Sequence, residues 1–195
     1  MSSSKPNPPI IGITVGDPAG IGPEIVLKAL SDPQLQGLVR PLVYADRVVL
    51  EQTLNLLGSK IELNAIDSPS EGRYGVGTLD FVDPHILREP IAYGAISAQG
   101  GQAGYKYLNR AIDDALDKSV DGLATAPLNK ESLQAAKLPY IDHTSMLKAR
   151  ATVNEPMTLF LVRTLRIFFL TRHISFREIP DAITFEGIVE ALPLC

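Results

Sequence analysis

A histidine between a carboxylate and a hydroxyl is the first group of residues in this chain that could do chemistry. Asp142, His143 and Thr144 are consecutive in a chain of 195 residues that contains 3 histidines. They follow a strand end that turns at Pro127 into a helix capped by Asn129. Ligands bind at the carboxyl ends of strands in α/β sheets, where this imidazole and hydroxyl could hydrogen-bond a hydroxy acid. The alternative is that His143 is a helix-capping or surface residue.

A glycine-rich turn near the start of the chain is the second candidate. Residues 16–24 read Gly-Asp-Pro-Ala-Gly-Ile-Gly-Pro-Glu, between a β-branched strand and a helix. Backbone N–H groups at such a helix start could hold an anion. However, Gly16, Gly20 and Gly22 do not have the dinucleotide-binding spacing, and no Gly-Lys-Ser/Thr follows, so the turn is not a P-loop. A tight strand-to-helix turn is the alternative interpretation.

The other two histidines stand alone in the sequence. His173 ends an apolar strand pattern, where a neutral imidazole could bind a metal, although a lone histidine is more often structural. His85 follows Pro84 in a predicted loop, and we expect it at the surface. The sequence supports neither a Ser-His-Asp order nor a cysteine nucleophile, because its 1 cysteine is Cys195. These residues alone leave the chemistry open.

Alternating strand and helix patterns must position these residues. Short apolar runs predict strands at 9–15, 42–44, 61–65, 78–82 and 121–126. Helical spacing predicts one helix from Pro23, a second capped by Asp46, and a third over 101–119. This order predicts an α/β fold with a mostly parallel sheet. Residues 83–100 form a long predicted loop, which is typical of a functional segment or a link between lobes.

The later part of the chain has a different pattern. Thr144 is predicted to cap a helix over 145–150, and residues 157–162 and 166–170 read as a hairpin. A last helical pattern runs from Pro180 through Ala191. We therefore expect a disordered tail at 1–8, a first α/β lobe at 9–124, and the start of a second lobe with a β-hairpin at 125–195.

Composition excludes several classes of function. Hydrophobic residues make up 45% of the chain and charged residues 21%, as in globular proteins. The net charge of −4 gives no basic surface for nucleic acid or an anionic membrane. Met1 to Pro9 lacks the apolar region of a signal peptide, and no apolar run is long enough to span a bilayer. We expect a soluble, cytoplasmic protein that binds neither nucleic acid nor membranes.

Four motifs occur together in this chain: residues 11–24, residues 125–131, His143-Thr144, and Thr171-Arg172-His173. Their order and spacing resemble the 4-hydroxythreonine-4-phosphate dehydrogenase family of vitamin B6 (pyridoxine) biosynthesis. The related 4-phosphothreonate and 4-phosphoerythronate dehydrogenases are equally similar. The resemblance covers nearly all of the chain, and the motifs are specific jointly, whereas singly only the first is.

The resemblance implies an isocitrate/isopropylmalate-dehydrogenase-like fold, with two α/β lobes, the site between them, and a homodimer. It implies that NAD, or NADP, oxidises a secondary alcohol on a phosphorylated hydroxy acid, followed by loss of carbon dioxide. A divalent metal (zinc, magnesium, manganese or cobalt) would hold the substrate oxygens and stabilise developing negative charge. By position, His143 and Thr144 match the substrate-binding pair and His173 matches the first metal-ligand histidine.

Some positions depart from the family's pattern. The His-Thr pair is usually preceded by Gly and followed by Glu, but this chain has Asp142 and Ser145. Arg172 replaces a small residue before the metal histidine. The other two metal histidines, and the Lys, Asn and Arg that hold the substrate phosphate, have no counterpart. The resemblance therefore predicts a shortened chain whose sheet exposes an edge.

Two alternatives to an active dehydrogenase follow from these departures. One is a catalytically inactive remnant that keeps the fold. The other is a generic α/β phosphate- or nucleotide-binding module that uses the turn at 16–24.

Overall fold

The computed structural model describes residues 7–35, 37–140, 142–151, 157–171 and 174–194. The chain separates into two compact units, Met1–Ala151 and Thr152–Cys195. Residues 125–151 belong to the first unit because two helices in this range pack on its longest helix. Most of the tail expected to be disordered, 1–8, lies outside the described residues.

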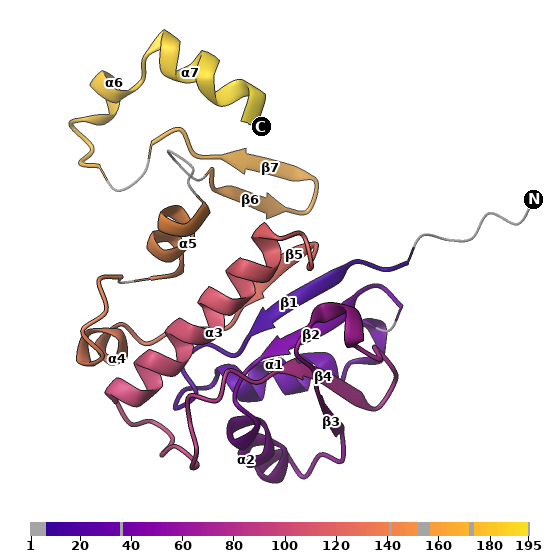
Figure 1. Ribbon diagram of the computed structural model, residues 1–195. Coiled ribbons are helices and arrows are strands. Elements are labelled where there is room, and N and C mark those ends of the chain that lie inside the picture. The colour runs from indigo at the N-terminus through magenta and orange to yellow at the C-terminus, as the bar shows by residue number, and fades with distance from the viewer. Residues whose placement is uncertain (1–6, 36, 141, 152–156, 172–173, 195) are drawn as a thin grey trace, which may run out of the picture. The chain divides into compact units, whose positions relative to one another are not determined.

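A five-stranded sheet forms the centre of the first unit (Figure 1). Its order is β3-β4-β2-β1-β5, and every pair in it is parallel. The strands are β1 (Ile10–Thr14), β2 (Arg40–Tyr44), β3 (Glu62–Ala65), β4 (Thr78–Val82) and β5 (Gly122–Thr125). The predicted α/β class and all five strands are confirmed. Among the described strands β5 pairs with β1 alone, so it is an edge of the sheet.

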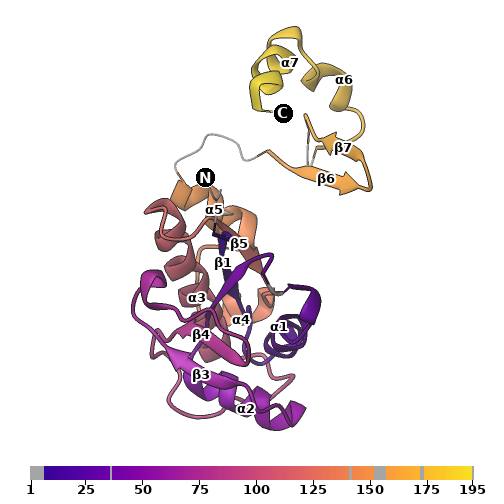
Figure 2. The same cartoon turned by 90° about the vertical axis from the view of Figure 1, so that its right-hand side faces the viewer.

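Helices cover both faces of this sheet. They are α1 (Gly22–Leu30), α2 (Arg47–Leu57), α3 (Ala98–Leu116), α4 (Lys130–Ala135) and α5 (His143–Ala151), with short 3₁₀ turns η1 (Pro33–Leu35) and η2 (Pro69–Glu71). Along the sheet, the connection from β1 to β2 runs towards the β3 edge, whereas the connection from β4 to β5 runs towards the β5 edge. Because such crossovers are right-handed, α1 and α2 cover one face and α3 the opposite face (Figure 2).

The core between sheet and helices contains two buried tyrosines with polar partners. The hydroxyl of Tyr44 donates to Asp114 Oδ2 at 2.8 Å, and the hydroxyl of Tyr107 donates to Asp46 Oδ2 at 2.7 Å. Phe81 and several aliphatic side chains fill the remaining space. Each buried side chain of this size contributes about 2 kcal/mol, so this core is the main source of stability.

Glycines let α3 approach its neighbours closely. A Cβ on Gly101 would lie 2.0 Å from the Ser132 carbonyl oxygen in α4. A Cβ on Gly104 would lie 3.0 Å from the Gly16 carbonyl oxygen. Since no larger side chain fits there, α3 packs directly against α4 and the glycine-rich turn, and it fixes both at the carboxyl edge of the sheet.

The long loop at 83–97 is tied to the rest of the first unit. Asp46 accepts hydrogen bonds from the amides of Ile86 and Leu87 at 2.7 and 2.9 Å. Further along, the Gly94 amide donates to the Ala19 carbonyl at 2.7 Å. The prediction that Asp46 caps α2 is wrong for the side chain: the residue is at the N-cap position, but its carboxylate bonds the loop instead.

The second unit consists of a hairpin and short helices. Strands β6 (Leu159–Val162) and β7 (Leu165–Phe168) pair antiparallel, as predicted. The single helix predicted from 180 to 191 is wrong: α6 (Ile179–Ala182) and α7 (Phe185–Ala191) are separated, and η3 (Leu192–Leu194) follows. The break occurs because Ile183 is extended and Thr184 caps α7 by accepting from the Gly187 amide.

Candidate functional site

Three segments meet at Ala126 and Pro127, just beyond β5. The Ala126 amide donates to the Thr14 carbonyl at 3.0 Å, and the Asp17 amide donates to the Pro127 carbonyl at 3.0 Å. His143, in the first turn of α5, contacts the Ala126 carbonyl oxygen through Nε2 at 3.2 Å. The glycine-rich turn, the end of β5 and the start of α5 therefore converge at the carboxyl ends of β1 and β5.

This place is also where the topology of the sheet changes direction. The chain leaves β1 towards α1 on one face of the sheet, whereas it leaves β5 towards α4, which packs with α3 on the other face. Such a switch point between neighbouring strands opens a crevice at their carboxyl ends, which is the usual ligand position in open α/β sheets. The geometry supports the interpretation in which this edge binds a ligand.

The contact with Ala126 indicates which nitrogen of the His143 ring carries the hydrogen. A carbonyl oxygen can only accept, so Nε2 carries the hydrogen, and in the neutral ring Nδ1 is the acceptor. Burial lowers the pKa of His143 below its ordinary value, against the opposing effects of the Ala126 carbonyl and the Asp142 carboxylate. The imidazole is thus neutral at pH 7 and can accept a hydrogen bond from a ligand hydroxyl.

The first turn of α5 is capped by Asp142 and not, as predicted, by Thr144. Asp142 Oδ1 accepts from the Ser145 amide at 2.8 Å, and this hydrogen bond is the main reason why the pKa of Asp142 is lowered. Thr144 lies inside the helix and its side chain is exposed. The prediction was wrong because Asp142, with a stronger acceptor, stands two positions earlier at the helix start.

The rest of α5 is anchored on α3. Met146 is fully buried and packs with Leu108 and Ile112. The rings of Tyr105 and Tyr140 stack with centroids 5.8 Å apart. These contacts hold one side of the helix, while its first turn faces the strand ends.

Three backbone amides of the glycine-rich turn have hydrogen-bond partners within the protein. Asp17 donates to Pro127, Gly20 donates to the Asp17 carbonyl, and the Ala19 amide donates to Asp17 Oδ1 at 2.9 Å. A Cβ on Gly16, which has a φ of 70°, would lie 2.1 Å from the Pro127 carbonyl oxygen. These contacts favour the tight-turn interpretation over an anion site.

The structure does not place all candidate residues. His173, the predicted metal ligand, lies outside the described residues. The side chain of His85 is 83% exposed and contacts Asp83, as expected for a surface residue. Within the described part of the chain, no three His, Cys, Asp or Glu side chains come together as a metal site. The role of His173 as a metal ligand therefore stays a prediction.

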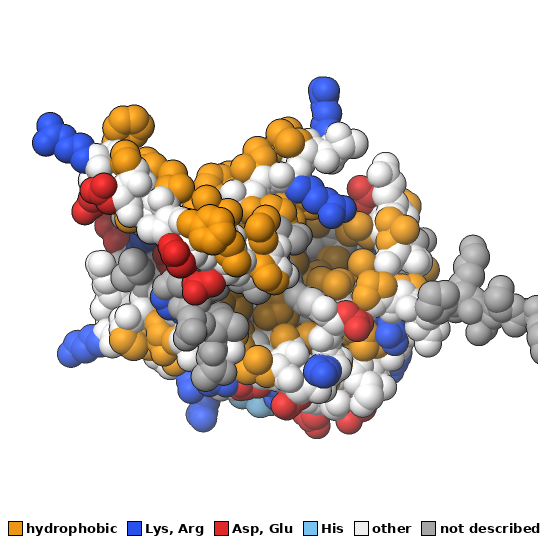
Figure 3. Space-filling view, turned by 90° about the horizontal axis from the view of Figure 1, so that it is seen from above, with side chains coloured by type: hydrophobic (Ala, Val, Ile, Leu, Met, Phe, Trp, Pro, Cys, Tyr) orange, Lys and Arg blue, Asp and Glu red, His pale blue; other side chains and the backbone are white. Residues whose placement is uncertain are grey.

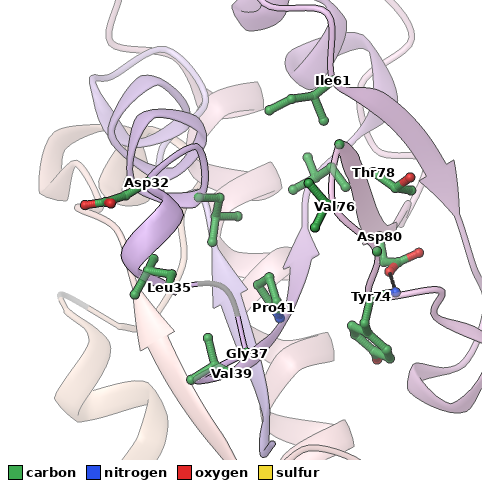
Figure 4. Close-up of a pocket in the computed structure, with 14 residues that line it drawn as sticks. Asp32, Leu35, Gly37, Val39, Pro41, Ile61, Tyr74, Val76, Thr78 and Asp80 are labelled. Atoms are coloured by element: carbon green, nitrogen blue, oxygen red, sulfur yellow. Dashed lines mark hydrogen bonds between the residues drawn. The ribbon is translucent and has the colours of Figure 1, made fainter.

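Two hollows lie away from His143. One, of about 370 Å³, is lined by the glycine-rich turn (Ala19, Gly20 and Ile21), by Glu24 of α1, by α2, and by Tyr93 and Gly94 of the long loop. The other, of about 130 Å³, lies at the amino edge of the sheet, where Pro41 and Thr78 begin their strands (Figure 4). Asp80 points towards Tyr74 there and accepts from its amide at 2.6 Å. We assign no ligand to either hollow.

Sequence reasoning missed two parts of the site. It identified neither the Ala126 carbonyl as the partner of the His143 ring nor Asp142 as the cap of the helix. No sequence signal marks a backbone carbonyl as such a partner. The cap could have been predicted, since Asp is a preferred N-cap residue and Asp142 stands directly before the helix.

Comparison with known proteins gives relatives over nearly the whole chain. A protein of Symbiobacterium thermophilum, provisionally named D-threonate 4-phosphate dehydrogenase, is 40% identical over 188 residues, which are 96% of this chain and 56% of the relative. A protein of the same name from Halalkalibacterium halodurans is 41% identical, with the same shares covered. The chain therefore spans about half the length of these curated relatives.

Solved structures agree with these relatives. The crystal structure of a 4-hydroxythreonine-4-phosphate dehydrogenase from Burkholderia phymatum superposes with a TM-score of 0.90 at 34% identity, covering 95% of this chain and 56% of that one. No helix in the described residues is long and apolar enough to cross a membrane. The sequence pattern of the family described as pyridoxal phosphate biosynthetic protein PdxA matches residues 37–195. The chain belongs to this family, as the four sequence motifs predicted.

Proposed function

We propose that the protein oxidises a phosphorylated hydroxy acid, such as 4-phosphohydroxythreonine or 4-phosphothreonate, with NAD or NADP, and that decarboxylation follows. This chain would contribute His143 and Thr144 to substrate binding. The names of the relatives support the reaction class. A homodimer, a cytoplasmic location, and a second lobe that begins near residue 125 belong to the same proposal.

The orientation of the His143 ring is the observation that carries the substrate role. Because Nε2–H is directed to Ala126, Nδ1 of the neutral ring can accept a hydrogen bond from the substrate hydroxyl. Thr144 supplies an exposed hydroxyl from the next residue of the helix. Such a pair would select a substrate with neighbouring oxygens and hold the carbon that is oxidised.

NAD or NADP would supply the hydride acceptor for that carbon, and we assign no residue of this chain to hold it. We likewise derive no step through a metal, because the described residues do not bring three ligands together. Metal dependence stays a proposal for the whole protein. Chelation followed by addition of zinc, magnesium, manganese or cobalt would test it.

Calorimetric titration of the 195-residue chain with 4-phosphothreonate tests the substrate role. We expect His143→Gln to weaken binding about tenfold or more, since the amide of Gln does not hold its acceptor oxygen at the position of Nδ1, and Thr144→Val to weaken it less. His85→Gln, an exposed histidine in the long loop, is the matched control and should bind normally. Equal affinity of wild type and His143→Gln would contradict the proposal.

Two further measurements separate the alternatives. NADH formation with the same substrate reports turnover, and binding without turnover would indicate the inactive remnant. Loss of inorganic phosphate binding in Gly20→Val, with His143 dispensable, would indicate the generic phosphate-binding module.

A further inference from the structure

The residues that flank the His143–Thr144 pair are bonded to each other. The Ser145 amide donates to Asp142 Oδ1 at 2.8 Å, and the Ser145 hydroxyl donates to the Asp142 carbonyl at 2.8 Å. The Asp142 amide in turn contacts the Ser145 hydroxyl at 3.3 Å. Together these contacts close the first turn of α5 on itself, and the two residues inside that turn are His143 and Thr144.

The imidazole depends on this turn for its position. Its contact with Ala126, at 3.2 Å, is at the long end of the hydrogen-bond range and cannot by itself fix the ring. One turn further along the same face of the helix, Met146 is buried against α3. A buried anchor at Met146 and a closed first turn leave the backbone of His143 little freedom, so the ring meets Ala126.

We propose that Asp142 and Ser145 are positioning residues for the substrate hydroxyl. Their reciprocal cap holds the His143 ring with Nε2 on Ala126 and presents Nδ1 and the Thr144 hydroxyl together. The inference rests on the proposed substrate role of that pair. Neither flanking residue needs to touch the substrate, because their effect passes through the geometry of the turn.

Charge and geometry make different contributions here and can be separated. Lys130, in the first turn of α4, and the His143 ring are the cationic or titrating groups that act on Asp142. Asp142→Asn removes the negative charge but keeps Oδ1 as an acceptor for the Ser145 amide. Asp142→Ala removes both, and Ser145→Ala removes only the hydroxyl half of the cap.

The test combines ring spectra with substrate titration of the 195-residue chain. Nitrogen NMR of the His143 ring, recorded without substrate, reports whether Nε2 alone carries the hydrogen. We expect Asp142→Ala to give a mixed tautomer and about fivefold weaker binding of 4-phosphothreonate, as loss of an N-cap would cause. Asp142→Asn should restore both properties, and Ser145→Ala should lie between. Asp32→Ala, which removes a comparable side-chain bond to the Gln34 amide, is the control.

Each outcome has a separate meaning. Wild-type ring spectra and affinity in Asp142→Ala would overturn the positioning role. A failure of Asp142→Asn to restore the spectrum would overturn it as well, because charge rather than the cap would then be responsible. If the wild-type chain does not bind 4-phosphothreonate, the proposed function fails, while the ring spectra still decide whether the cap positions the histidine.

Discussion

The two units of this chain differ in where they put their apolar side chains. The first unit buries Tyr44, Phe81, Leu42 and their neighbours between the sheet and the helices. In the second unit no described residue is buried, and Phe160, Leu161, Phe176 and Phe185 are more than half exposed. Figure 3 shows a face of the molecule with many apolar side chains at its surface.

The difference shows that a regular secondary structure can form without burying its apolar side chains. The hairpin β6–β7 has a regular antiparallel register, and Phe160 and Phe169 pack edge to face. Yet a two-stranded hairpin is only marginally stable without a surface to pack on. The first unit gains its stability because α3 and α1 cover both faces of its sheet.

The largest difference is expected between two Leu→Ala substitutions, one in each unit. Leu42→Ala in β2, where the side chain is 0% exposed, should lower the free energy of unfolding by about 2–5 kcal/mol. Leu161→Ala in β6, where it is 65% exposed, should change it by less than about 0.5 kcal/mol. Denaturant unfolding followed by circular dichroism measures both. Equal losses would show that the second unit has a core of its own.

A buried and an exposed aspartate provide the next test. Asp46→Asn places an amide nitrogen among three donors, from Tyr107, Ile86 and Leu87, so we expect a loss of about 2 kcal/mol. Hydrogen exchange of the Ile86 and Leu87 amides should rise at the same time. Asp181→Asn in α6 is the exposed counterpart and should leave stability unchanged. Unaltered exchange in Asp46→Asn would mean that the loop does not depend on this carboxylate.

The smallest expected effect is on the pH dependence of stability. Burial lowers the pKa of His143 in the folded chain, so the unfolded chain binds its proton more readily. The free energy of unfolding should therefore fall as the pH decreases from about 6.5 towards the folded-state pKa, by less than about 1 kcal/mol. His143→Gln should remove this contribution.

Unfolding curves between about pH 5.5 and pH 7 measure the effect. Glu178→Gln in the second unit is the control, because hydrogen bonds from the Ser175 hydroxyl and amide lower the pKa of Glu178 away from that range. The same slope in wild type and His143→Gln would show that the imidazole is not buried enough to titrate differently on folding.

The fold could be predicted well where short-range physics decides it. Alternating and continuous apolar runs located β1 to β5, and Asn129 was correctly read as a cap, since its side chain accepts from the amides of Glu131 and Ser132. The prediction for the side chain of Asp46 was wrong because capping rules consider only the helix that follows the residue. A loop 40 residues later offered it stronger partners.

For the site, the sequence determined the residue types and their neighbours in the chain: an imidazole beside a hydroxyl, flanked by Asp142 and Ser145, after the strand that ends at Thr125. It also determined the family, because four motifs recur in a fixed order. Only the tertiary structure decided which atom the His143 ring faces, that the amides of Asp17, Ala19 and Gly20 have partners within the protein, and that the two units bury apolar surface so unequally. These properties depend on contacts between segments far apart in the sequence. A local sequence pattern does not indicate which distant carbonyl or helix a side chain will contact.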